Sequence, residues 1–372
     1  MKVLRKIVLL ILLRKIIRSE CKSWFFPVRQ AAKTCKIKKL TYKQIQAAQQ
    51  YYEEIWGKKI SLEWHEYSYS MKGDYFIKII PEYLYFVYIL PFLNDTVRGR
   101  SGVDKNLYDV YLHDIIQPRS ILKNMNGFYY AAGNALTEEE AITLCHNLHS
   151  VIIKPTIDSW CGLNVCKCSV SDGVVDIGGI SVGELFQRYG RDFIIQEVIT
   201  QHPVLASLNP TSVNTVRIVT YRRLSGEVVA LSSVVRVGRS GEIVDNGHAG
   251  GFCCGIQGNG WLKEYGYAFI SGERKKMTDN GTVFKNVQIP QFDKVLKLAC
   301  QLHKRFPYLR LIGWDFTIND HNEVVFIELN DGPGIEIMQL CNGPVFGDYT
   351  DEILQEVREN KFRVKLEKEI IR

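Results

Sequence analysis

The chain has 372 residues, of which 46% are hydrophobic and 23% charged, so it can bury a sizeable core and is not a disordered protein. Its net charge of +7 is unevenly spread, because residues 1–40 hold 12 Lys or Arg and one acid, which leaves −4 for the rest. A mildly acidic body argues against a nucleic-acid-binding protein. The length suggests two or three domains or subdomains.

Residues 1–24 begin with a short apolar run, Ile7–Leu13, that has Lys or Arg on both sides. The run is too short to span a bilayer, which needs about 20 apolar residues. No small-residue cleavage site of a signal peptide follows it. We expect a helix on the inner, anionic face of the cytoplasmic membrane, so that a cytoplasmic protein would be peripheral there. A helix packed on the protein body and an uncleaved anchor are the alternatives.

The ten cysteines lack the spacing of a secreted disulfide framework. Cys161, Cys166 and Cys168 could suggest zinc, but no second Cys/His pair at finger spacing accompanies them. Reduced, mostly buried thiols in a cytosolic protein are the better interpretation.

Residues 25–136 are expected to be mixed in structure and mostly helical. Tyr42–Gly57 has the pattern of a helix ended by a glycine. The aromatic stretch Tyr75–Leu93 could touch lipid, although a helical core explains it better. Asp104-Lys105-Asn106 is expected to open another helix over Leu107–Ile116.

From residue 137 onward, short helices alternate with strands. Thr137 and the three glutamates after it are predicted to cap a helix that runs to about His149. The other predicted strands are Val151–Lys154, Val165–Val170, Val174–Ile177, Phe193–Val198, Val213–Tyr221 and Glu227–Val237. The other predicted helices are Ser181–Tyr189, Phe292–Phe306 and Asp351–Leu366.

Two apolar runs within residues 313–334 read as strands joined by the polar turn at 319–322. Asp315 lies on the first run, and Glu328 and Asn330 share a face of the second because side chains alternate along a strand. A tight hairpin could bring Asp315 to that face, diagonal to Glu328. Three hard oxygen donors are the ligand type that Mg²⁺ selects, and Mg²⁺ held in this way usually keeps nucleotide phosphates as its other ligands.

Lys154 closes a predicted strand and precedes a loop of small and polar residues that contains Gly162. A lysine in such a place can hold nucleotide phosphates while the loop folds over them and excludes water. The spacing is not that of a Walker A motif. A surface hairpin with an incidental lysine is the alternative.

The strand that begins at Phe193 ends in Gln196-Glu197-Val198. Its backbone N–H and C=O groups could face an adenine edge, and Glu197 could take the amino group or a ribose hydroxyl. An edge strand with solvated polar residues is the alternative.

Arg217 lies in an otherwise buried-looking strand, where a charge needs a partner or a ligand. Its planar fork suits phosphate or carboxylate, and a structural ion pair is the alternative. Arg236 poses the same question. In the glycine-rich loop 245–251, Asn246 and His248 could touch substrate. His248 is a candidate general base, or else a structural hydrogen-bonding residue.

The order of these features resembles the ATP-grasp superfamily: a lysine with a small-residue loop, a strand with Gln-Glu, a strand with Arg, and Asp…Glu-x-Asn. They are more narrowly similar to the sugar-transfer-associated ATP-grasp group of bacterial capsule and exopolysaccharide loci, over about residues 100–350. The segments that carry the resemblance are IIKPTIDSWCG, IIQEVITQHP, VNTVRIVTY, VDNGHAGG and GWDFTI…FIELNDGPG.

The resemblance implies an α+β fold in which two subdomains with antiparallel sheets clamp a nucleotide, after a mostly helical N-terminal region. The lid subdomain would cover residues 137–200, and the C-terminal subdomain with the Mg²⁺ site would cover 201–372. The residues that would contact ATP by motif match are Lys123, Lys154, Gly162, Gln196, Glu197, Val198 and Arg217. Asp315, Glu328 and Asn330 would hold Mg²⁺. No ribose-binding acid follows the hinge, where the chain reads Thr200-Gln201-His202-Pro203.

The activity implied is that of an ATP-dependent carboxylate–amine ligase that works through an acylphosphate, with ATP and Mg²⁺ as cofactors and Arg217 and His248 as catalytic residues. In a polysaccharide context its substrates would be sugar-linked. A kinase that phosphorylates a hydroxyl with the same clamp is one alternative. A nucleotide-binding scaffold at a membrane assembly is another, and the complete Asp315, Glu328 and Asn330 set argues against it.

Overall fold

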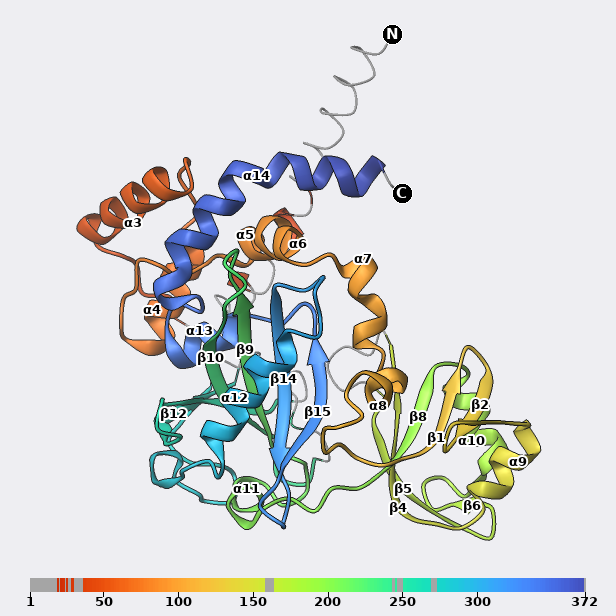
Figure 1. Ribbon diagram of the computed structural model, residues 1–372. Helices are drawn as coiled ribbons and strands as arrows, with labels where there is room; N and C mark the ends of the chain where they lie inside the picture. The colour runs from red at the N-terminus through yellow and green to blue at the C-terminus, as the bar shows by residue number, and fades with distance from the viewer. Residues whose placement is uncertain are drawn as a thin grey trace.

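The computed structural model shows two β-sheets side by side, with helices above and around them (Figure 1). It describes residues 19, 21–23, 25, 28–29, 36–157, 164–242, 245, 250–268 and 273–370, the last ten for the backbone only. The expected membrane-associating segment, residues 1–24, falls almost entirely outside this set. Within the described part of the chain, none of the helices has the length and apolar character needed to cross a membrane.

The N-terminal region is helical, as expected. Its first long helix, α3 (Tyr42–Ile55), begins with a capping box in which Thr41 and Gln44 accept hydrogen bonds from each other's backbone N–H groups. Helix α4 covers Glu63–Lys72. The shorter helices that follow are α5 (Glu82–Leu84), the π-helix η1 (Tyr85–Ile89), α6 (Leu90–Leu93), α7 (Thr96–Gly99), the 3₁₀ turns η2 (Arg100–Val103) and η3 (Lys105–Leu107), and α8 (Tyr108–Tyr111).

The helix expected over Leu107–Ile116 is too long, because only the single turn of α8 is α-helical there. Tertiary hydrogen bonds hold both ends of this segment. The Asn106 side chain donates to the carbonyl oxygen of Asn124 at 2.9 Å, and the Phe326 N–H donates to the Ile116 carbonyl oxygen at 2.8 Å. Residues 106–116 are thereby joined to one strand of each sheet, and these tertiary hydrogen bonds take the place of helical ones.

The smaller half is an eight-stranded antiparallel sheet with the spatial order β3-β2-β1-β8-β4-β5-β6-β7. Its strands are β1 (Ser120–Met125), β2 (Phe128–Ala131), β3 (Asn134–Leu136), β4 (Leu148–Pro155), β5 (Cys166–Ser171), β6 (Val174–Val175), β7 (Ile180–Ser181) and β8 (Phe193–Glu197). Helices α9 (Glu138–Leu144) and α10 (Val182–Tyr189) cover one face and enclose an apolar core with it. Three of the strands precede residue 137, so the sheet starts earlier than the lid boundary that we expected.

Helix α9 has the predicted capping box, in which the Thr137 hydroxyl accepts from the Glu140 N–H and the Glu140 carboxylate accepts from the Thr137 N–H. It ends at Leu144 rather than near His149, because β4 already begins at Leu148 and pairs there with β5. Helix α10 begins at the expected place, with Ser181 as its cap.

The larger half is a seven-stranded antiparallel sheet with the order β13-β12-β11-β10-β9-β14-β15. Its strands are β9 (Thr215–Arg222), β10 (Val228–Val237), β11 (Phe252–Ile256), β12 (Leu262–Tyr267), β13 (Arg274–Lys275), β14 (Leu311–Ile318) and β15 (Val324–Asn330). One face packs on α12 (Phe292–His303). The other face packs partly on α13 (Glu336–Asn342), α14 (Thr350–Ile370) and the N-terminal helices, over which α14 lies in Figure 1.

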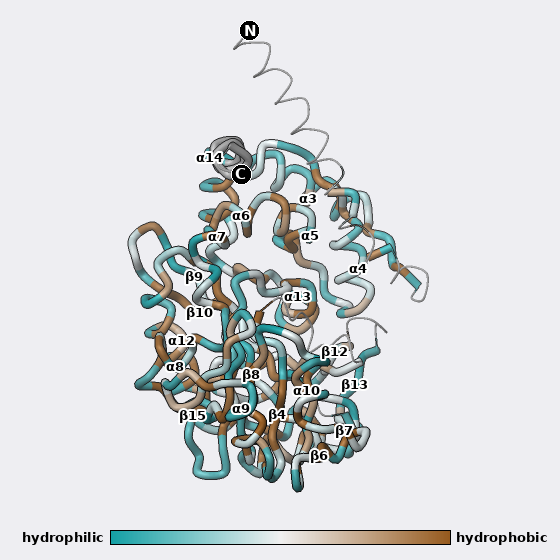
Figure 2. The backbone as a smooth tube through the Cα atoms, turned by 90° about the vertical axis from the view of Figure 1, so that its right-hand side faces the viewer, coloured by the Kyte–Doolittle hydropathy of each residue, from teal (hydrophilic) through white to brown (hydrophobic). Residues whose placement is uncertain are grey.

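Alternation along β14 decides which of its side chains face α12. Trp314 and Phe316 are buried in the core beneath α12, so Asp315 between them points to the opposite face. The Trp314 indole N–H donates to the Thr220 hydroxyl at 2.8 Å, and that hydroxyl lies 2.6 Å from Nδ1 of His303 on α12. On the α12 side, β14 is therefore held by buried apolar side chains and by the Trp314 hydrogen bond. Figure 2 shows apolar segments along the inner strands and hydrophilic ones along outer loops.

Candidate functional site

A row of charged side chains crosses three neighbouring strands on the face of the seven-stranded sheet opposite α12. The register pairs Arg217 of β9 with Asp315 of β14, and Asp315 with Glu328 of β15. We expected Asp315 to lie diagonal to Glu328, and that prediction is wrong, because the two residues lie directly opposite each other. A β-bulge between Asp315 and Phe316 shifts the pairing by one residue and brings the two carboxylates into register.

The Asp315 carboxylate is only 1% exposed and is held by two guanidinium groups. Arg217 donates to it through Nε at 2.7 Å and Nη2 at 2.5 Å, and Arg236 of β10 donates through Nη1 at 3.1 Å. Arg236 also lies 3.3 Å from Asp245. Burial lowers the pKa of Arg217, but Asp315 outweighs burial and raises that pKa above its usual value. Arg217 is thus held as a cation in an ion pair, the alternative that the sequence had left open.

Glu328 faces cations from two directions. Its Oε2 lies 3.3 Å from Nζ of Lys105, on the 3₁₀ turn η3 that precedes the lid sheet. Burial raises the pKa of Glu328, but Lys105, Lys154, Arg217 and Arg236 together bring it down to about 2, so the side chain is ionised at neutral pH. Burial, with a further contribution from Lys105, lowers the pKa of Lys154 to about 8, against the opposing effect of Glu328.

Lys154 reaches this place from the eight-stranded sheet. The register places Lys154 of β4 and Lys123 of β1 on either side of Ile194 of β8, so both lysines lie on one face of that sheet. Lys123 does not extend to Glu328, because its Nζ contacts the Asp109 carboxylate at 2.5 Å and the Asn106 carbonyl oxygen at 2.7 Å.

We name the meeting point of the two sheets the cradle. Its members are Lys105, Lys154, Arg217, Arg236, Asp245, Asp315 and Glu328. Four cations face three carboxylates, which leaves a positive excess suited to an anionic ligand. Lys105 and Asp245 are members that we did not expect from the sequence. The only signal for Lys105 was its place in the Asp-Lys-Asn segment, which we had interpreted as the start of a helix.

The donor groups present are compatible with Mg²⁺. A carboxylate offers about four lone-pair positions. Asp315 accepts three hydrogen bonds from Arg217 and Arg236, and Glu328 forms one ion pair with Lys105. Each carboxylate therefore keeps at least one lone-pair position for a metal ion. The Nδ2 atom of Asn330, two residues after Glu328 on the same strand, is buried and has no hydrogen-bond partner among the described residues. This unpaired N–H₂ group is a donor that suits a phosphate oxygen, whereas a metal ion would take the Oδ1 atom of the same amide.

The strand predicted to face adenine is β8. It lies between β1 and β4 in the middle of its sheet, so the edge-strand alternative is wrong. The Gln196 side chain donates to the Pro118 carbonyl oxygen at 3.3 Å. Glu197 accepts from the exposed Arg119 side chain at 3.2 Å. Val198 follows the last residue of the strand and is half-buried.

Two predicted site residues, Gly162 and His248, lie outside the described residues, as do Asn246 and Cys161. Among the described residues, three or more His, Cys, Asp or Glu side chains nowhere gather in a metal-binding group. The eight described cysteines are free thiols, and five of them are buried.

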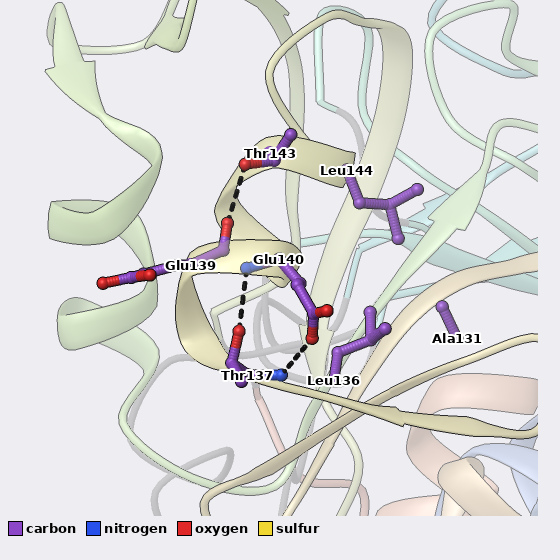
Figure 3. A pocket seen from close by; sticks show the side chains of 7 residues that line it. All are labelled: Ala131, Leu136, Thr137, Glu139, Glu140, Thr143 and Leu144. Atoms are coloured by element: carbon purple, nitrogen blue, oxygen red, sulfur yellow. Dashed lines mark hydrogen bonds between the residues drawn. The ribbon is translucent and has the colours of Figure 1, made fainter.

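A shallow recess elsewhere on the lid sheet is separate from the cradle (Figure 3). It is lined by Ala131, Leu136, Thr137, Glu139, Glu140, Thr143 and Leu144. Figure 3 shows that hydrogen bonds of the α9 cap take up much of its polar lining, and Glu139 points away from it. Because no cation lines the recess, it does not suit nucleotide phosphates.

Two antiparallel sheets that meet at a cluster of cations and carboxylates have the architecture of the ATP-grasp fold, as predicted. A family model described as sugar-transfer associated ATP-grasp matches residues 162–355. The chain belongs to this family, which confirms the resemblance stated above. Enzymes of the ATP-grasp class are ATP-dependent ligases, and ATP and Mg²⁺ are their cofactors.

A comparison with curated proteins gave no match. Among solved structures, the VanG D-Ala:D-Ser ligase from Enterococcus faecalis is 15% identical with a TM-score of 0.42, over 71% of this chain and 63% of that one. The D-alanine–D-alanine ligase from Bacillus anthracis complexed with ATP is 15% identical with a TM-score of 0.37, over 72% and 69%. The ATP-grasp ligase PsnB complexed with a precursor peptide and AMPPNP is 12% identical with a TM-score of 0.39, over 71% and 61%. This chain thus spans about three fifths of the PsnB chain.

Proposed function

We propose that the protein is an ATP-dependent carboxylate–amine ligase that binds MgATP in the cradle. One observation carries this proposal: two ionisable carboxylates lie side by side on one sheet while cations converge on them from both sheets. A nucleotide triphosphate with its metal supplies the opposite pattern of charge, since its phosphates suit the cations and its metal suits the carboxylates.

The chain's own residues would have separate roles. Asp315, Glu328 and Asn330 would hold Mg²⁺, which would neutralise negative charge on the phosphates when bound. Lys154 and Lys105 would contact phosphates from the lid side. Arg217 uses two of its five N–H donors on Asp315, which leaves the others for a phosphate and gives it a catalytic role.

The remaining assignments follow the family resemblance. Lys123 would contact phosphate once released from Asp109, the Gln196–Val198 backbone would read adenine, and Gly162 would belong to the loop over the phosphates. His248 would act as a base toward the amine. We retain the subdomain division at residue 200 and move the start of the lid to about Ser120, where its sheet begins.

The proposed reaction has two steps. A carboxylate oxygen of the acceptor bonds to the γ-phosphorus of ATP, and the bond to ADP breaks, which gives an acylphosphate. An amine then bonds to the acyl carbon, phosphate leaves, and the amine loses a proton. The cradle contributes by positioning the groups and spreading negative charge. The family description, sugar-transfer associated ATP-grasp, supports a sugar-linked substrate. Its place in capsule or exopolysaccharide synthesis, on the cytoplasmic side of the membrane, is proposed from the resemblance alone.

The variant Glu328→Gln tests the site. It keeps the shape of the side chain but removes the charge that faces Lys105 and the metal. We expect ADP release, measured with MgATP and a panel of amino acids and uronic acids, to fall about a hundredfold or more, the size of effect seen when one stabilising group is removed. Glu323→Gln, on the exposed turn of the same hairpin, is the matched control and should keep wild-type turnover. Unchanged activity in Glu328→Gln would refute the metal assignment.

Hydroxylamine distinguishes the ligase from a kinase that uses the same clamp. The ligase should form a hydroxamate from the carboxylate substrate when ATP is present and the amine is absent. A stable phosphoester with no hydroxamate would identify a kinase instead.

A further inference from the structure

One short segment contacts both sheets at the cradle. It consists of residues 104–109, which include the 3₁₀ turn η3 and the start of α8, the helix between the two sheets in Figure 1. The Asn106 side chain donates to the hydroxyl of Thr156, just after β4, at 3.1 Å. From β15, the Leu329 N–H donates to the Tyr108 hydroxyl at 3.2 Å. Because this segment joins the lid sheet to the seven-stranded sheet, we name it the bridge segment.

The bridge segment places a cation on a carboxylate that we assign to the metal. Nζ of Lys105 lies 3.3 Å from Oε2 of Glu328, and the two side chains are only 11% and 27% exposed. Burial raises the pKa of Glu328, and Lys105 is the cation that opposes burial most. An ammonium group and Mg²⁺ both bind a carboxylate through its oxygen lone pairs, and they repel each other at such short range. The two cations therefore compete for Glu328.

The bridge segment also places an anion on a lysine that we assign to phosphate. The two carboxylate oxygens of Asp109 lie 2.6 and 2.5 Å from Nζ of Lys123, and the Asn106 carbonyl oxygen lies 2.7 Å from the same atom. A lysine ammonium has three N–H donors, and these three contacts use them. A phosphate on Lys123 would therefore have to displace the carboxylate, which also repels it.

The two contacts supply the same signs of charge that MgATP would supply. We propose that the bridge segment acts as an internal substitute for MgATP, which displaces it on binding. Lys105 takes the place of the metal ion on Glu328. Asp109 takes the place of a phosphate on Lys123. This inference rests on the proposed MgATP site and adds a residue-level competition to it.

The displacement gives Lys105 two opposite effects. While it contacts Glu328, its charge weakens the binding of a metal ion alone. Once the nucleotide is present, the same ammonium contacts a phosphate and strengthens the binding of the metal–nucleotide complex. A ligand shifts such an equilibrium only by its different affinity for the two arrangements, so metal and nucleotide together should displace the bridge segment better than either alone.

The affinity for Mn²⁺, measured by water-proton relaxation without nucleotide, tests the metal half of the proposal. Mn²⁺ suits the same oxygen ligands as Mg²⁺. Lys105→Gln should bind Mn²⁺ about tenfold more tightly than wild type, because a competing cation is gone. It should bind MnATP about tenfold more weakly, because a charged contact to phosphate is lost. Lys105→Arg should keep the weaker Mn²⁺ affinity of wild type. Lys78→Gln, which removes a lysine paired with Asp351, is the control and should change neither affinity.

Calorimetric titration with ADP in the presence of a chelator tests the phosphate half. Asp109→Asn should bind ADP about threefold more tightly than wild type, since a partly exposed ion pair no longer holds Lys123. Asp114→Asn is the matched control, because Asp109 and Asp114 are 45% and 46% exposed and each pairs with one cation. Its affinity for ADP should stay at the wild-type value.

Opposite shifts of the Mn²⁺ and MnATP affinities in Lys105→Gln would support the inference, because a purely structural role would lower both. An Mn²⁺ affinity no higher than that of wild type would overturn the metal half. An ADP affinity no higher in Asp109→Asn than in Asp114→Asn would overturn the phosphate half. If Lys105→Gln unfolds at a lower temperature than wild type, Lys105→Met is measured by the same criterion.

The proposed function fails by a different result. Glu328→Gln should bind Mn²⁺ more weakly than wild type if Glu328 is a metal ligand. Equal Mn²⁺ affinity in that variant and wild type would refute the metal site, and with it the metal half of the inference. A loss in Glu328→Gln without a gain in Lys105→Gln would leave the metal site in place and overturn the competition alone.

Discussion

The two sheets of this protein treat their charges differently. In the seven-stranded sheet, Asp315 is enclosed between two guanidinium groups, and apolar cores lie on both faces of the sheet. In the eight-stranded sheet, one face is packed on α9 and α10, and Lys154 on the other face has no described carboxylate within ion-pair distance. The larger sheet, which we name the platform, therefore neutralises its own charges, whereas Lys154 of the lid sheet has no described carboxylate within ion-pair distance.

The chain that joins the sheets is anchored to the platform. The Asp320 N–H donates to the Thr200 carbonyl oxygen at 3.0 Å, and the His202 N–H donates to the Ile318 carbonyl oxygen at 2.8 Å. These two hydrogen bonds fix residues 200–202 to the β14–β15 hairpin, so the fixed part of the connection starts just after Val198. The lid sheet ends at Glu197, just before that residue, so a movement of the lid sheet would turn there and leave the β14–β15 hairpin in place.

The largest expected effect is on the platform. Asp315→Asn would leave Arg217 and Arg236 buried with a neutral partner, and it should lower the free energy of unfolding by about 3–5 kcal/mol. Asp109→Asn breaks the more exposed pair with Lys123 near the lid and should cost less than about 1 kcal/mol. Urea unfolding of both variants gives the comparison. If both variants lost the same free energy of unfolding, the ion pairs of the platform would not be stronger than those near the lid.

A smaller effect is expected at the lid cation. Lys154→Gln should weaken MgATP binding about tenfold, because a charged contact to phosphate is lost. Since the pKa of Lys154 is about 8, wild-type affinity for ATP should fall as the pH rises through about 8 and the ammonium loses its proton. Lys154→Arg stays charged and should show little change between about pH 7 and 9. Fluorescence titration at several pH values measures this, and a flat wild-type profile would contradict it.

The protonation of Lys154 should also change the free energy of unfolding, which should rise with pH where the affinity for ATP falls. Its pKa is lower in the folded protein than in the unfolded chain, so the unfolded chain binds more protons between about pH 8 and 10.5. The contribution of Lys154 to the free energy of unfolding should therefore rise with pH in this window. Comparing wild type with Lys154→Gln by urea unfolding at both ends isolates that contribution.

The smallest effect is expected at the hinge end of β8. Glu197→Gln disturbs only the exposed pair with Arg119, so unfolding should change by less than about 1 kcal/mol. If the backbone rather than the side chain reads adenine, the affinity for ATP should change less than about threefold. Val198→Pro removes a backbone N–H and should weaken binding more. A large loss in Glu197→Gln alone would place the side chain in the adenine site.

Much of the cradle could be found from local sequence. The β14–β15 hairpin, its polar turn and the shared face of Glu328 and Asn330 follow from alternation, which is a property of neighbouring residues. The capping boxes at Thr137 and Ser181 are local for the same reason. The β-bulge beside Asp315 was not predictable, because the register between two strands depends on how they pair and pack and not on the residue pattern of either strand alone.

The sequence by itself determined the strands that carry most of the cradle, β4, β9, β10, β14 and β15, and which of their residues are charged on a buried-looking face, because periodicity is short-ranged. It did not reveal β1–β3, which lie in a region expected to be mostly helical, or β11–β13. Only the tertiary structure decided that Lys105 lies 3.3 Å from Glu328 and that Arg217 closes on Asp315. It also decided that Lys72 and Lys263 converge on α13. Each of these contacts joins residues far apart in the chain, and the side-chain burial that fixes them exists only after the helices and both sheets have packed.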